Sequence, residues 1–159
     1  MPSLIQTPEY LTFKYLQHWQ KENDVQKLKS SFSDIGPLFS YLLEKSESLY
    51  SQLPQRKDGQ EAFIHPLNVV LALRDAKISD EITLCVGLLH DYVEEIVDLY
   101  RDEHNLDEDG KDIEKLDRYE TEVFAGLEKD LVKHTDKTTA KNTIEALKLL
   151  TRHKRDFYY

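Results

Sequence analysis

The chain has 159 residues and a mass of 18.7 kDa, and 40% of its residues are hydrophobic, which suits one domain with a sizeable core. Acidic residues outnumber basic ones by 30 to 21, and the resulting net charge of −9 opposes general binding to nucleic acids. No stretch approaches the roughly 20 apolar residues of a membrane span, and the single cysteine, Cys85, fits a reducing compartment. We therefore expect a soluble, cytoplasmic protein with neither nucleic-acid nor membrane partners.

The composition favours helices throughout, because glycine and proline are scarce, with five of each, while Leu, Glu, Lys and Asp are abundant. The spacing of apolar residues predicts helices over about residues 8–23 and 36–53, followed by a loop, QRKDGQEA. A third helix should begin at Pro66, since proline suits the first position of a helix, and should run to about Ala76. This places His65 at the N-cap or just before it.

The next segment predicts a long central helix that runs from Ser79, a plausible N-cap, toward Tyr100. Its apolar residues follow helical spacing over about five turns. An acidic loop, HNLDEDGKD, then separates it from two further helices at about residues 113–133 and 139–151. The predicted fold class is therefore all-α.

Ionisable residues crowd together on the central helix in the sequence LLHDYVEE. His90 and Asp91 are adjacent, and Glu94 and Glu95 follow one turn later, beside apolar residues where unpaired charge is costly. A divalent cation would resolve this cost, with His65 as the natural third ligand. Each feature alone has a plainer interpretation, because an HD dipeptide arises by chance, His65 could cap a helix, and the glutamates could lie on an exposed face.

Residues 56–95 resemble the opening of the hydrolase domain in Rel/SpoT-type alarmone hydrolases of the HD superfamily. The shared elements are an Arg-Lys pair, a glycine, an aromatic-Ile pair before His-Pro, an apolar helix, and Leu-Leu-His-Asp followed by two acids. The resemblance implies an HD-domain helical bundle, with residues 1–54 as N-terminal helices and 55–159 as the HD domain, in one compact domain overall. A weaker similarity follows in ALKLLTRHKRDFYY at residues 146–159.

The resemblance implies a metal-dependent phosphohydrolase. Its Mn²⁺ ion would be held by His65, His90 and Asp91, and Glu94 and Glu95 would position or activate the attacking water. The implied substrate is a nucleotide pyrophosphate ester such as guanosine 3′,5′-bis(diphosphate). Arg56 and Lys57 match positions close to the nucleotide, although two solvated loop cations are an equally good interpretation.

The family's fourth metal ligand lies in a later motif that this sequence does not contain, so we expect the chain to be a fragment or a shortened form. Asp136 or Asp156 could replace that ligand, but each fits better as a solvated charge. The alternative function is a regulatory or binding module that keeps the HD fold and has lost turnover. The sequence leaves open whether the first 50 residues cover the site, form a homo-oligomer surface or do neither.

Overall fold

The computed structural model describes residues 21–57, 59–107 and 110–153, and within them every regular element is an α-helix. These residues form two compact units that divide between Leu88 and Leu89. The expected all-α fold class is confirmed. The boundary predicted near residue 55 stays a prediction, and the helix predicted at residues 8–23 lies almost entirely outside the described residues.

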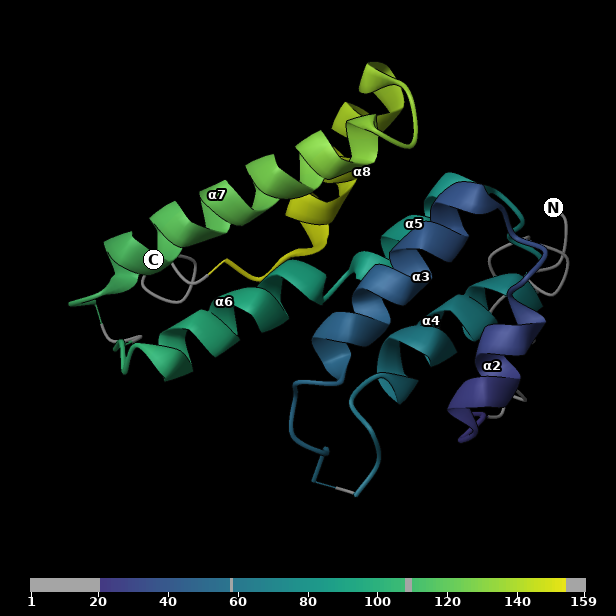
Figure 1. Cartoon of the computed structure of the whole chain (residues 1–159), viewed down its shortest axis with the longest axis horizontal. Helices are drawn as coiled ribbons and strands as arrows, with labels where there is room; N and C mark the ends of the chain where they lie inside the picture. Colours follow the sequence, from purple (N-terminus) through teal and green to yellow (C-terminus); the bar gives the residue numbers. More distant parts are fainter. Residues whose placement is uncertain (1–20, 58, 108–109, 154–159) are drawn as a thin grey trace, which may run out of the picture. The chain divides into compact units, whose positions relative to one another are not determined.

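The first unit contains α2 (Val25–Ser31), α3 (Pro37–Tyr50), α4 (Ile64–Asp75) and most of α5 (Glu81–Leu89) (Figure 1). Helix α2 packs against α4. The rings of Phe32 and Phe39 meet edge to face, with their centroids 5.9 Å apart. The core of this unit is formed by fully buried side chains, among them Leu28, Phe32, Phe39, Leu42, Leu67, Val70 and Leu84.

Helix α4 begins at Ile64, two residues before the predicted start at Pro66. The first N–H groups of a helix have no partner within it, so proline is accommodated as the third residue as well as the first. His65 is consequently the second residue of α4 and not its N-cap, which is Phe63. The predicted helix at residues 36–53 is observed as α3, with Pro37 at its first position.

The long central helix was predicted wrongly, because two helices occupy its place: α5 ends at Leu89 and α6 (Tyr92–Glu103) begins two residues later. Asp91 precedes α6 with φ −103° and ψ −1°, and its carbonyl accepts the first α6 hydrogen bond, from the Glu95 amide. The predicted cap at Ser79 is also displaced, since the Asp80 side chain accepts hydrogen bonds from the amide and hydroxyl of Thr83.

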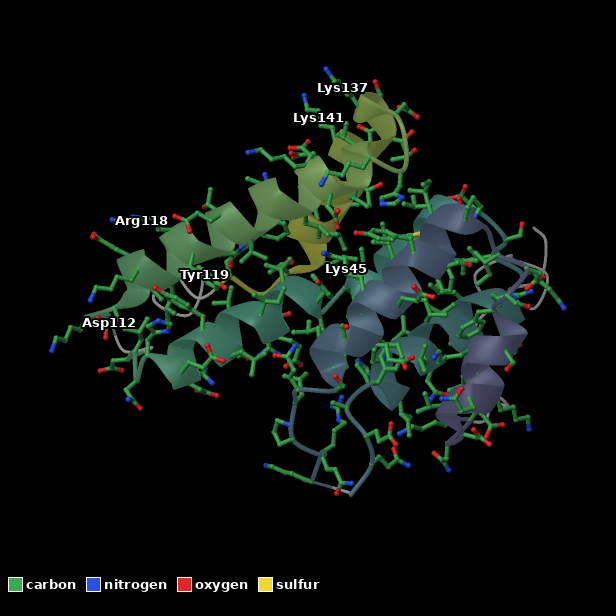
Figure 2. The ribbon with its side chains drawn as sticks, viewed as in Figure 1. Lys45, Asp112, Arg118, Tyr119, Lys137 and Lys141 are labelled. Atoms are coloured by element: carbon green, nitrogen blue, oxygen red, sulfur yellow. The ribbon has the colours of Figure 1, made fainter. Side chains whose placement is uncertain are left out.

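The second unit contains α6, α7 (Ile113–Val132) and α8 (Lys137–Leu150), and α7 packs against both of the others (Figure 1). Both α7 and α8 agree with the predicted bounds to within two residues. Tyr119, labelled on α7 in Figure 2, stacks on Tyr100 of α6 with the ring centroids 3.8 Å apart. The core of this unit includes Leu116, Phe124, Leu127, Leu131, Ile144 and Leu147.

The outer faces of the helices carry charge. Lys137 and Lys141, one turn apart at the start of α8, point outward in Figure 2. None of the helices in the described part of the chain is both long enough and apolar enough to cross a membrane.

Candidate metal centre

His90 and Asp91 form the two-residue link between α5 and α6. The His90 Nε2 atom lies 2.9 Å from the Asp91 Oδ2 atom, and the two side chains are 22% and 30% exposed. The residues on both sides, Leu88 and Leu89 before and Tyr92 and Val93 after, are buried. The interruption of the helix therefore turns one imidazole and one carboxylate toward each other at a half-buried position, within reach of solvent.

His65 comes from the first turn of α4, where it is half-buried between the buried residues Ile64 and Pro66. The predicted ligands are two imidazoles and one carboxylate, which are the donors that Mn²⁺, Fe²⁺ and Zn²⁺ accept in proteins. Within the second unit the structure brings together His90 and Asp91. The part of His65, which belongs to the first unit, stays a prediction.

Glu94 lies in the first turn of α6, three residues after Asp91, and its side chain is 19% exposed. Burial raises the pKa of the Glu94 carboxyl, and the negative charge of Asp91 raises it further. Arg152 acts in the opposite direction, since its backbone N–H donates to the Glu94 carboxyl and its Nε atom lies 4.0 Å from Oε1. Glu94 can therefore hold or release a proton more readily at moderate pH than an exposed glutamate.

Glu95 is half-buried beside Glu94 in the same turn. Neighbouring residues of a helix point about 100° apart, so the carboxylates of Glu94 and Glu95 point in different directions from α6. Glu94 carries the raised pKa and the contact with Arg152, and these support its place in the predicted acidic pair.

Arg56 and Lys57 lie exposed in the loop between α3 and α4. The Arg56 amide donates to the Gln60 carbonyl at 2.9 Å, and the Gly59 amide donates to the Arg56 carbonyl at 2.8 Å, which closes a tight turn with Gly59 at φ +81°. The side chains therefore project from a defined loop, and their role in substrate binding stays a prediction.

Asp136 is a helix cap: its carboxylate accepts hydrogen bonds from the amide and the hydroxyl of Thr139 at the start of α8, at 2.8 and 2.7 Å. These hydrogen bonds explain the position of the Asp136 carboxylate as a helix cap, and no metal is needed to explain it. Asp156, the other residue considered as a substitute ligand, lies outside the described residues. Arg152 is the residue beside Glu94 that the sequence did not single out, because nothing local relates it to a position 58 residues earlier.

Comparison of the chain with models of known protein families, with curated proteins and with solved structures finds no match. The resemblance at residues 56–95 therefore stays a prediction, and the case for a function depends on the geometry of the residues themselves.

Proposed function

We propose that this chain is a metal-dependent phosphohydrolase whose divalent cation is held by His65, His90 and Asp91. The observation that carries the proposal is the pairing of His90 with Asp91 at the half-buried link between α5 and α6, where Nε2 and Oδ2 lie 2.9 Å apart. The interruption between α5 and α6 supports it, because a continuous helix would direct His90 and Asp91 about 100° apart.

The contact between His90 and Asp91 is compatible with shared ligation. Two neighbouring ligands of a six-coordinate ion, each about 2.1 Å from it, lie about 3.0 Å apart, and the observed separation of Nε2 and Oδ2 is 2.9 Å. A direct hydrogen bond gives the same distance, so only a binding measurement distinguishes the two arrangements. Mixed imidazole and carboxylate ligands suit Mn²⁺, which is the proposed ion.

A bound divalent cation supplies Lewis acidity, which lowers the pKa of water and neutralises charge on a phosphoryl group. Glu94 would accept the proton of the attacking water, a role that its half-buried carboxyl supports because the raised pKa makes it a better base. Glu95 would assist from the same turn. The proposed substrate is a nucleotide pyrophosphate ester of the guanosine 3′,5′-bis(diphosphate) type, with Arg56 and Lys57 as anion-binding side chains.

Mn²⁺ binding by the purified chain, measured by titration calorimetry, tests the proposal. We expect one ion per chain, no binding by His90→Ala, and a Mn²⁺ affinity at least roughly tenfold lower in His65→Ala, because the loss of a direct ligand should cost no less than the loss of a group behind it. His134→Ala removes an exposed imidazole after α7 and is the matched control. Circular dichroism should show the same helicity in all four proteins.

Equal Mn²⁺ affinity in the parent and His90→Ala would overturn the metal assignment. If binding depends on His90, a panel of nucleotides that includes guanosine 3′,5′-bis(diphosphate) follows, with released phosphate and pyrophosphate as the readout. Metal binding without turnover of any nucleotide would favour the regulatory or binding module over the enzyme. A homo-oligomer would be detected in the same preparation by light scattering.

A further inference from the structure

Each residue of the segment that follows α8, Thr151–His153, makes hydrogen bonds to a helix of the second unit. The Thr151 amide and hydroxyl both donate to the Leu147 carbonyl, at 2.9 and 2.7 Å, and Thr151 is only 6% exposed. The backbone N–H of Arg152 donates to the Glu94 carboxyl on α6. The ring of His153 lies between α7 and the end of α8. The chain is therefore attached to all three helices of this unit within three residues.

Both ring nitrogens of His153 face oxygen atoms that accept hydrogen bonds. Nδ1 lies 2.5 Å from Oε1 of Glu120 on α7, and Nε2 lies 3.0 Å from the carbonyl oxygen of Lys148 on α8. A carbonyl oxygen has no proton, so Nε2 must be the donor of the second bond. The first bond needs one further proton between His153 and Glu120. A neutral imidazole beside an ionised carboxylate carries only one N–H and can make only one of the two bonds.

The surroundings of His153 favour positive charge. Glu120 is 4% exposed, and an ionised carboxylate that is buried to this extent needs a charged or hydrogen-bonding partner. The carbonyl of Lys148 belongs to the last turn of α8, where the helix dipole is negative. His153 lines a hollow of about 270 Å³, whose other charged residues are Glu120 and Glu128 on α7 and Lys148 on α8.

Among the residues that line the hollow, Lys148 carries the positive charge. Its ammonium group contacts residues other than Glu120 and His153. It lies 5.8 Å from the centre of the Phe124 ring and 3.7 Å from the Glu145 carboxylate. Among the described residues, Arg152 is next to His153 in the chain and has its guanidinium beside Glu94.

We infer that His153 and Glu120 form a proton-dependent clamp, which holds the segment after α8 in place while the pair keeps its shared proton and loosens when that proton is lost. Since Arg152 lies between the two anchored residues Thr151 and His153, the clamp also fixes Arg152 beside Glu94. The clamp rests on contacts within the second unit alone, whereas its influence on catalysis through Glu94 rests on the proposed function. His153 is thus a positioning residue and not a catalytic one.

Nitrogen-15 NMR of the metal-free chain tests the clamp, and its result does not depend on whether Mn²⁺ binds. The six histidines are assigned by substitution, with His153→Gln identifying the relevant ring. The nitrogen-15 shifts of the His153 ring, followed between about pH 5.5 and about pH 8.5, report whether both ring nitrogens carry a proton while the segment is held. The protection factors of the Thr151 and Arg152 amides should fall about tenfold across the same range, as for the loss of one charge-assisted hydrogen bond.

Glu120→Gln keeps the size of the side chain and removes its charge, so it should abolish the pH dependence of those protection factors. His134→Gln, at an exposed histidine, should leave it unchanged. Equal protection of the Thr151 and Arg152 amides at both pH values in the parent would overturn the clamp. The comparison within the parent protein decides the matter even if Glu120→Gln does not fold, which circular dichroism would reveal.

Discussion

The Leu73 side chain of α4 lies directly over Gly87 of α5: a Cβ atom at Gly87 would come 2.6 Å from the Leu73 Cδ1 atom. Gly87 is buried in the last part of α5, shortly before the interruption that carries His90 and Asp91. Helix α4 carries His65 in its first turn. The absence of a side chain at Gly87 therefore lets α4 and α5 approach closely at this point.

Gly87→Ala is expected to bring little or no gain in stability even though alanine is the better helix former. The gain in helix propensity is worth about 1 kcal/mol, whereas forcing an added methyl group into a packed contact costs about 1–3 kcal/mol. The net change should be a loss of stability or close to zero, and urea unfolding followed by circular dichroism measures it.

The double variant Leu73→Ala/Gly87→Ala is the control for this contact. If the methyl group acts through Leu73, the effects of the two substitutions will not add, and Gly87→Ala will be tolerated better in the Leu73→Ala background. A Gly87→Ala protein that is more stable than the parent by the full helix-propensity gain would show that α4 and α5 are not in tight contact at this point.

The helices were predictable from the sequence because amphipathic spacing and end signals are local properties. The bounds of α7 and α8 agree with prediction for this reason. The interruption at His90–Asp91 was not predictable, since the apolar positions of α5 and α6 together keep the spacing of one continuous helix. A two-residue break without glycine or proline leaves no signal in that pattern.

The candidate ligands His65, His90 and Asp91 were proposed from a motif, and the structure shows the pairing of His90 with Asp91 at the link between α5 and α6. The approach of Arg152 to Glu94 and the pairing of His153 with Glu120 join positions that are 58 and 33 residues apart. Tertiary packing determines such pairs, and no local pattern in a single sequence encodes them.

Asp136→Ala should destabilise the protein without affecting Mn²⁺ binding, because Asp136 caps α8 through Thr139. The loss of one helix cap corresponds to a fall of roughly 4 °C in the melting temperature. The hydrogen bonds from Thr139 lower the pKa of Asp136, so its contribution is present at neutral pH and is lost as the pH falls through that lowered value.

Asp136→Asn is the matched variant, since asparagine caps helices about as well as aspartate. It should keep most of the stability at neutral pH, and its melting temperature should depend less on acid than that of the parent. A weakened Mn²⁺ affinity in Asp136→Asn would instead restore Asp136 as a candidate ligand.

Cys85 should be unreactive in the native protein. Burial raises the pKa of its thiol to about 12, with smaller contributions from the charges of Glu81 and Asp80, so almost no thiolate exists at neutral pH. Labelling with a chromogenic disulfide reagent at about pH 8 should be at least roughly a hundredfold slower than in denaturant, because it requires opening of the first unit. Prompt labelling without denaturant would mean that the interior of this unit opens readily.

Glu94→Gln should make the metal-free protein more stable at neutral pH, which is the reverse of the usual effect of removing a half-buried polar group. Burial raises the pKa of Glu94 in the folded state, so folding binds its proton more tightly, and the parent loses stability as the pH rises from the ordinary glutamate value through the raised one. Glutamine does not titrate and can still accept the Arg152 N–H. Urea unfolding in EDTA should therefore show a stability difference that grows from about pH 4 to about pH 7, with the exposed Glu122→Gln on α7 as the control. A constant difference across that range would show that the environment of Glu94 does not penalise its charge, and it would remove the main support for Glu94 as the proton acceptor.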